Sequence, residues 1–367
     1  MKFKFYPRES RIYDFLKFPR LIYFDKNKNE TDDNFEEFVI TSYVEFVKEA
    51  EEKLAPYRKE IQKFYAGHFY HEYDFIDLVS RTHTIFNYED EKEYLDMLLT
   101  LEDSEIIKSI VHSIIAINEE GHSYSDVAME RVEKISSNKE DLISFIKDLP
   151  IEAASKWNLF LIIEEPVDHV KNYVDLMYKI LPIFESIYSS YEAEVKEYGE
   201  KLVGFLNEKG PQGLEDITYS IVKPDVVDYG ETNIIISIVF SYAISIMSSV
   251  KISYVAWGLR MEEAFKYMKE INENKTNERI QVFKNLGDKT RYEVAKLIAS
   301  GENSTKEIAN ALGVSSATIS YHINNLLTSK IIKLDKVDNK HFHVVDYGFL
   351  EEVISGFMED LKFPKND

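Results

Sequence analysis

The chain has 367 residues, of which 44% are hydrophobic and 13% aromatic, a composition too apolar for a disordered protein. It contains no cysteine, which excludes disulfides, thiolate metal sites and a cysteine nucleophile and fits a reducing cytoplasm. Its formal net charge of −21 argues against a protein that coats nucleic acid. The length predicts at least two domains, and because residues 1–15 carry charges throughout, we expect no signal peptide.

Most of the chain before residue 210 is predicted to be helical. Residues 104–121 place isoleucine and valine at i, i+3 and i+4, the spacing typical of an amphipathic helix. A shorter helix should stop at Pro150, because proline cannot continue a helix. One or two helices over residues 175–210 should end at Gly210.

The pattern changes after residue 210. Residues 234–247 alternate large and small side chains, and the run is shorter than the ~18 to 20 apolar residues of a membrane span. With 216–230 and 250–259 it predicts a small antiparallel sheet. Helix returns afterwards, with a polar segment at 272–278. We therefore predict a mainly helical α+β protein, with an N-terminal domain over 1–270 and a C-terminal domain over 278–361.

The C-terminal part contains a pattern for two helices joined by a tight turn. Ser304 and Glu307 have the spacing of a capping box at the start of the first helix. Gly313 can adopt the positive φ that a sharp turn needs, and Val314 can fill the angle between the helices. Ser315 is placed to cap the second helix.

The second helix is predicted to have two different faces. Ile319, Ile323 and Leu326 fall on one face at i, i+4 and i+7. The opposite face holds small or polar residues: Ser316, Ala317, Ser320 and Tyr321. Small residues let a helix approach DNA closely, and hydroxyl groups can bond to bases and phosphates. Thr318 is expected to bond a phosphate or the first turn of the helix.

The neighbours of this helix pair favour DNA binding over a plain helical hairpin packed in a core. A capped helix is predicted over 288–301, and a β-hairpin over 331–346 carries Lys336 and Lys340 near its tip. Residues 278–345 hold ten Lys or Arg and seven Asp or Glu, a local charge of +3 that leaves −24 for the rest. A helix, a helix-turn-helix and a β-hairpin in this order indicate a winged helix.

These motifs together resemble the ArsR family of winged-helix repressors. The resemblance rests on "LGDKTR", "STKEIANALGVSSATISYHINNLLTSKII" and the basic hairpin, and it covers about residues 278–346. It implies that the helix from Ser315 is the recognition helix and that the hairpin over 333–345 is the wing. It also implies a dimer that leaves its operator when an effector binds.

Two departures from the family pattern argue against metal sensing. Metal-sensing members carry cysteines at the start of the helix that here reads "STKEIANAL", and this chain has none. Other members bind metal through Asp and His on the last helix, whereas "YGFLEEVISGFMEDLKF" has no histidine. That last segment instead carries an apolar stripe predicted to serve a dimer: Phe349, Leu350, Val353, Ile354, Phe357 and Leu361.

Other candidate sites are weaker. "GHFYHEYD" groups His68, His71, Glu72 and Asp74, but it lacks a defined third ligand and is interpreted as an aromatic helix surface. His341 and His343 are interpreted as wing residues that contact DNA or solvent, and His322 as a residue that packs in the helix pair or faces a phosphate. No catalytic motif is present, so we expect no enzyme. The aromatic residues of the large domain fit a core or a ligand pocket.

The sequence thus predicts a cytoplasmic transcriptional regulator, a repressor, that binds an inverted-repeat operator in duplex DNA as a homodimer. The N-terminal domain would sense a small molecule or protein, or mediate assembly, with no cofactor and no membrane attachment. Two alternatives stay open: an enzyme with a fused winged helix, and a winged helix that binds protein. The residues predicted to contact DNA are Ser315, Ser316, Ala317, Thr318, Ser320, Tyr321, Lys306, Lys336 and Lys340.

Overall fold

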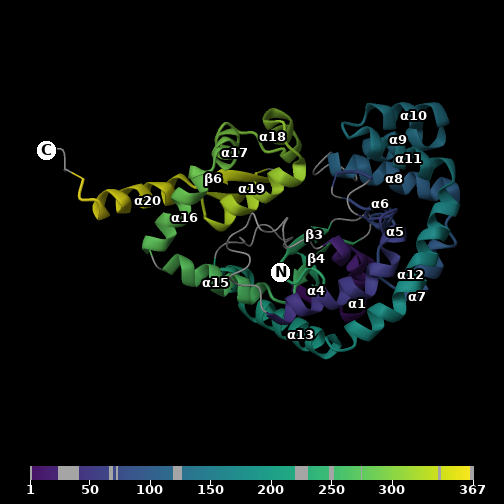
Figure 1. Cartoon of the computed structure of the whole chain (residues 1–367), viewed down its shortest axis with the longest axis horizontal. Coiled ribbons are helices and arrows are strands. Elements are labelled where there is room, and N and C mark those ends of the chain that lie inside the picture. The colour runs from purple at the N-terminus through teal and green to yellow at the C-terminus, as the bar shows by residue number, and fades with distance from the viewer. Residues whose placement is uncertain are drawn as a thin grey trace. The chain divides into compact units, whose positions relative to one another are not determined.

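The computed structural model describes residues 2–23, 41–65, 69–71, 73–118, 126–219, 230–247, 252–273, 275–337 and 340–363 (Figure 1). These residues are mainly helical and include two small sheets, which confirms the predicted fold class. They divide into two compact units. The N-terminal unit comprises Lys2–Asn207 and Gly230–Met261, and the C-terminal unit falls within Glu208–Tyr229 and Glu262–Asp367. That 1–270 and 278–361 fold as separate domains stays a prediction.

The N-terminal unit is built mostly of helices. They are α1 (Pro7–Lys17), η1 (Phe18–Tyr23), α4 (Thr41–Leu54), η2 (Ala55–Tyr57), α5 (Arg58–Ile61), α6 (Phe75–Ser80), α7 (Glu91–Leu98), α8 (Asp103–Asn118), α9 (Asp126–Ser137), α10 (Lys139–Asp148), α11 (Ala153–Glu164), α12 (Pro166–Tyr188) and α13 (Glu192–Lys209). Helix α8 confirms the helix predicted from the isoleucine pattern, and α10 ends before Pro150 as predicted. Gly210 follows α13 with a φ of 63°, a conformation that favours glycine.

The sheet of the N-terminal unit differs from the predicted one. Its strands are β1 (Lys2–Phe5), β2 (Glu231–Ser237), β3 (Ile244–Met247) and β4 (Tyr254–Gly258), in the order β1-β2-β4-β3. Strands β1, β2 and β4 run parallel, and only β3 is antiparallel to its neighbour, so the prediction of an antiparallel sheet was wrong. Helix α14 (Pro211–Thr218) occupies the start of the strand expected at 216–230, whose residues 220–229 lie outside the described part.

The run predicted as one strand is interrupted by a buried carboxyl group. The hydroxyl of Ser237 donates to Asp14 at 2.5 Å, and the backbone N–H groups of Ile238 and Val239 donate to it at 2.8 and 3.3 Å. These N–H groups therefore bond to a side chain on α1 instead of to a neighbouring strand. The chain turns here, and β3 starts at Ile244. The period-two pattern could not reveal this partner, which lies more than 200 residues away in sequence.

Helix α1 has a row of buried polar side chains at i, i+4 and i+7, and the first two of them bond to β2 or to the residues directly after it. Ser10, Asp14 and Lys17 are 0%, 0% and 6% exposed. The hydroxyl of Ser10 accepts from the N–H of Ile236 at 2.9 Å and donates to the carbonyl of Tyr6 at 2.7 Å. Because an unpaired buried polar group costs about 1–3 kcal/mol, each partner stabilises this packing.

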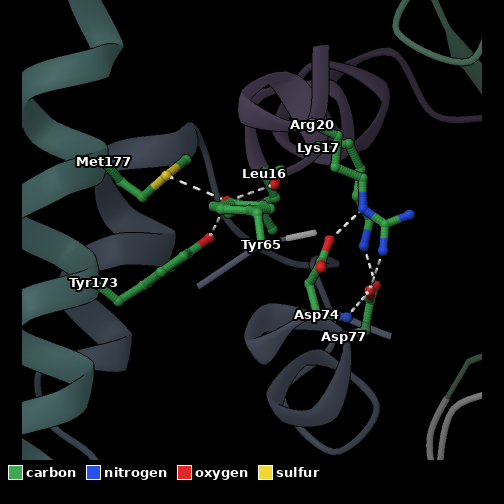
Figure 2. Close-up of polar contacts among 8 residues, drawn as sticks. All are labelled: Leu16, Lys17, Arg20, Tyr65, Asp74, Asp77, Tyr173 and Met177. Carbon is green, nitrogen blue, oxygen red and sulfur yellow. Dashed lines mark hydrogen bonds and ion pairs between the residues drawn. The ribbon is translucent and has the colours of Figure 1, made fainter. Parts of the chain in front are cut away.

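The row continues into a buried ion cluster (Figure 2). Lys17 pairs with Asp77, and Arg20 pairs with Asp74 and, at 3.1 Å, with Asp77. Asp74 and Asp77 form the capping box of α6, so the two cations tie η1 and the end of α1 to the start of that helix. Burial alone would raise the pKa of Asp77, but Lys17 and Arg20 hold it below the usual range. Nearby, the hydroxyl of Tyr65 donates to the carbonyl of Leu16 at 2.9 Å.

The segment "GHFYHEYD" contributes Asp74 to this ion cluster. Tyr70 and Tyr73 form an isolated antiparallel bridge, so the interpretation as a helix surface was wrong. Phe69 and Tyr70 are buried, whereas His68 and Glu72 lie outside the described residues. Within the described part of the chain, no group of three metal-binding side chains is present. No helix among the described residues is long and apolar enough to cross a membrane.

The C-terminal unit begins with α14 and contains the predicted winged helix. Its further elements are α15 (Met261–Glu273), α16 (Lys275–Gly287), α17 (Lys289–Ala299), α18 (Thr305–Leu312), α19 (Ser316–Thr328), β5 (Ile332–Val337), β6 (Lys340–Val345) and α20 (Tyr347–Asp360). The helical stretch predicted after the sheet is described as α15 and α16, on either side of residue 274.

The burial of Asp14 should make the stability of the protein depend on pH. Burial raises the pKa of Asp14 to about 7, although its hydrogen bonds act in the opposite direction. Between about pH 4 and 7 the folded chain keeps a proton that the unfolded chain releases, so the free energy of unfolding should fall as pH rises through this window. The fall should amount to a few kcal/mol, because each tenfold difference in proton affinity between the two states corresponds to ~1.4 kcal/mol.

Denaturant unfolding of the wild type and Asp14→Asn at pH 4.5 and 7.5 checks this. The wild type should lose more stability across the interval than the variant, which has no proton to release at this position. The remaining titrating groups are common to both proteins, so they cancel in the comparison. Parallel loss of stability in the two proteins would contradict the assignment.

Candidate nucleic-acid interface

The C-terminal unit is held together by a core that α16, α17, α18, α19, β5 and α20 share. Its buried members are Val282, Val294, Ala295, Ile298, Ile308, Ala309, Ile319, Ile323, Leu326, Ile331, Ile332 and Val353. The predicted row Ile319, Ile323 and Leu326 lies in this core, with exposed fractions of 0%, 4% and 0%. One face of α19 is therefore committed to packing, and the opposite face is left for other contacts.

The turn between α18 and α19 forms as the sequence predicts. Gly313 has a φ of 67°, in the left-handed region, and Val314 packs against the core from between the helices. Ser304 accepts from the N–H of Glu307 at 3.3 Å, which is half of the predicted capping box. The reciprocal bond is replaced, because the N–H of Ser304 donates to the carboxylate of Glu302 at 3.0 Å.

The start of α19 is capped by hydroxyl groups. Ser315 accepts from the N–H of Thr318 at 3.1 Å, and the two hydroxyl groups lie 2.8 Å apart. Thr318 thus bonds within the first turn, which is one of the two roles predicted for it. Because the N-terminal end of a helix carries a partial positive charge and unpaired N–H groups, this end of α19 is suited to a phosphate.

The residues predicted to contact DNA from α19 differ in how far they are exposed. Ser315 is exposed, and Ser316, Ser320 and Tyr321 are half-buried. Tyr321 was predicted to be exposed, but its ring lies 5.1 Å from the ring of His322. The side chain of Ala317 lies outside the described residues. Sequence reasoning missed Asn324, which is exposed on the same side of the helix.

His322 belongs to the packed side of α19. It is 8% exposed, as predicted for a residue that packs in the helix pair. Burial lowers its pKa, an effect that nearby Asp288 opposes and Arg291 reinforces. This burial favours the neutral form of His322.

Strands β5 and β6 pair in antiparallel register, from Ile332 with Val345 to Val337 with Lys340. Lys336 pairs with His341 in this register, and Leu334 pairs with His343. The backbone thus brings Lys336 and Lys340 to the tip end of the hairpin, as the sequence predicts. Their side chains, that of His341 and the turn at 338–339 lie outside the described residues. Burial lowers the pKa of His343, which favours the neutral form of this wing residue.

The positive charge of this unit is partly neutralised within it. Lysines pair with carboxylates in Lys296–Glu293 at 2.9 Å, Lys330–Glu278 at 3.1 Å and Lys333–Asp346 at 3.1 Å. Lys306, on α18, is half-buried. Fewer lysines are therefore available to contact phosphate than the composition of residues 278–345 alone indicates.

Helices α16 and α20 pack together and leave an apolar surface exposed. The rings of Phe283 and Phe357 lie 4.8 Å apart, and Arg279 pairs with Asp360 at 2.8 Å. The exposed large hydrophobic residues of the two helices and the chain after them are Ile280, Phe283, Tyr347, Ile354, Met358, Leu361 and Phe363. The predicted stripe on the last helix thus divides: Val353 is buried in the core of the unit, and Ile354 and Leu361 face outward.

Comparisons with known proteins agree with this geometry. Residues 286–335 match a family model described as a helix-turn-helix domain. Over 73 residues, the chain is 26% identical to the arsenical resistance operon repressor of Staphylococcus aureus. This alignment covers 20% of the chain and 70% of that repressor. No solved structure matches the chain. The C-terminal unit therefore contains a helix-turn-helix domain, of which α18 and α19 are the two helices.

The buried row of α19 predicts a stability difference between neighbouring residues. Ile323→Ala should leave a cavity in the core and lower the free energy of unfolding by roughly 2–5 kcal/mol. Asn324→Ala is the matched control, because this exposed residue should change stability by less than about 0.5 kcal/mol. Denaturant unfolding measures both, and equal effects would contradict the assigned orientation of the helix.

Proposed function

We propose that the protein is a sequence-specific DNA-binding transcriptional regulator. The observation that carries the proposal is the division of α19 into a face buried in the core and an outer face of small and polar residues. A recognition helix needs this division, because it must be held firmly while its outer face enters the major groove. The likeness of the unit to a bacterial operon repressor supports the same function, and repression is the proposed mode.

Contacts to phosphate would position this helix. Ser315 and Thr318 lie at the positive end of α19, and Lys306 lies on the preceding helix. Lys336 and Lys340 lie at the tip end of the hairpin, where a wing reaches the DNA backbone or the minor groove. The outer-face residues, Ser316, Ala317, Ser320 and Tyr321, would contact base edges.

A homodimer is part of the proposal. The exposed apolar surface of α16 and α20 resembles a buried interface more than a surface in contact with water, with Ile354 51% and Leu361 59% exposed. A two-fold axis through this surface would present two copies of α19, about 34 Å apart, to successive major grooves. The operator would then be an inverted repeat.

The N-terminal unit is proposed to respond to a non-metal effector, a small molecule or protein, or to mediate assembly. Two features favour a non-metal effector: the chain has no cysteine, and its last helix has no histidine. The unit would change the affinity of the C-terminal unit for DNA without a cofactor or catalysis. A regulator of this kind works in the compartment that holds the DNA, which is the proposed cytoplasmic location.

DNA binding can be tested with the full chain and fragmented genomic DNA. We expect enrichment of discrete fragments, and an affinity for them that falls with salt by about 0.9 in the log–log slope for each phosphate contact. Random DNA should compete poorly, because the formal net charge of −21 disfavours non-specific binding. Absence of enrichment at low salt, or a slope near zero, would contradict DNA binding and favour a winged helix that binds protein.

The effector proposal predicts that metals do not release the DNA. Zinc, cadmium or arsenite at stoichiometric amounts should leave the affinity for the enriched fragments unchanged, because the chain has no cysteine and its last helix has no histidine. Binding titrations with and without each metal measure this. Release that a chelator or thiol reverses would show a metal site and overturn this part of the proposal.

A further inference from the structure

The outer face of α19 includes a residue that the DNA-binding proposal does not yet use. An α-helix turns by about 100° per residue, so Asn324 lies between Ser320 and Tyr321 around the helix axis. It is opposite the buried row of Ile319, Ile323 and Leu326. Asn324 is exposed, whereas Ser320 and Tyr321 beside it are half-buried.

The adjacent Asn325 shows what a structural asparagine looks like in this helix. Asn325 is 6% exposed, and its side-chain amide donates to the carbonyl of Tyr321 at 3.2 Å. The side chain of Asn324 makes no hydrogen bond within the described part of the chain, and only its backbone carbonyl is engaged, by the hydroxyl of Thr328 at 2.8 Å. Its amide group is therefore available to a ligand on the outer face.

The composition of α19 limits which bases this face can recognise. Residues 316–328, "SATISYHINNLLT", contain no arginine and no lysine. Guanine is most often recognised by two hydrogen bonds from Arg or Lys to its O6 and N7 atoms, and α19 cannot make this contact. Asparagine instead makes paired hydrogen bonds to adenine, donating to N7 and accepting from the N6 amino group.

We propose that Asn324 is a specificity-determining residue that recognises an adenine, and that the base pairs facing Asn324 and its neighbours are A·T pairs. The proposal rests on the proposed function as a DNA-binding regulator. Ser320 and Asn324 are about 6 Å apart along the helix axis, at a rise of about 1.5 Å per residue. Because base pairs are spaced by about 3.4 Å, this separation corresponds to at most about two base-pair steps, and both residues can contact one half-site.

The first test uses selection from a random-sequence duplex library by the full chain. Wild-type protein should enrich half-sites with an invariant adenine, and Asn324→Ala should lose the preference at that position while keeping the others. Its affinity for the selected site should fall about tenfold, the scale of one paired base contact. Guanine at the position affected by Asn324→Ala, or the same motif and affinity for both proteins, would overturn the proposal.

The second test addresses the contact atoms. Replacing the adenine by 7-deazaadenine removes N7 without changing Watson–Crick pairing. This should lower the DNA affinity of the wild type several-fold. It should leave the affinity of Asn324→Ala unchanged, because that variant has no side-chain amide at this position to donate to N7. Equal losses in the two proteins would overturn the contact.

Asn325→Ala is the matched control, with thermal unfolding measured for each variant. It should lower the unfolding temperature, because Asn325 is buried and bonded, and keep the adenine preference. Asn324→Ala should leave the unfolding temperature nearly unchanged and lose the adenine preference. If the wild type selects a motif that does not depend on Asn324, this inference fails and the proposed function stands. If the wild type selects no duplex, both fail.

Discussion

The arrangement of the C-terminal unit depends on the burial of one face of α19. Ile319, Ile323 and Leu326 together contact the core that the surrounding helices and β5 share. Burying three such side chains contributes about 1.5–3 kcal/mol each, which is large against the roughly 5–15 kcal/mol by which a folded protein is stable. The rotation of α19 about its axis is therefore set by the core, and the identity of the outward residues follows from it. Asn324 and Asn325 are one residue apart, which places them about 100° apart around the helix axis. Asn324 therefore faces outward, where a ligand can reach it, whereas Asn325 is buried.

A different constraint organises the N-terminal unit. There, α1 buries polar and charged side chains, and each must find a partner because a lone buried charge is strongly destabilising. Asp14 bonds to the backbone after β2, and Lys17 and Arg20 pair with the carboxylates that cap α6. Such contacts add little net stability over an apolar core, but they form only when the paired segments lie in one particular position relative to each other. They join segments that lie far apart in the sequence: 14 with 238, and 17 with 77.

This difference explains which elements the sequence could predict. The winged helix is built from local signals, since Gly313 and Ser315 act on residues within one turn of themselves. The Ser304 cap was predictable for the same reason, although Glu302 replaces its reciprocal bond. The sheet was mispredicted because its topology depends on distant pairs. Strand β1 spans only Lys2–Phe5, and the end of β2 is set by a carboxyl group on α1. No periodicity in residues 234–247 contains that information.

The electrostatics of the chain bear on how such a regulator would achieve specificity. Phosphate contacts give affinity for any DNA, whereas base contacts distinguish one site from another. Here the outer face of α19 carries no charge, several lysines of the unit are paired with carboxylates, and the formal net charge is −21. These features would weaken the sequence-independent contribution to binding. Discrimination between an operator and random DNA would then depend on the neutral hydrogen bonds of α19 and on two half-sites bound at once. A single lost base contact then affects operator binding strongly and random-DNA binding very little.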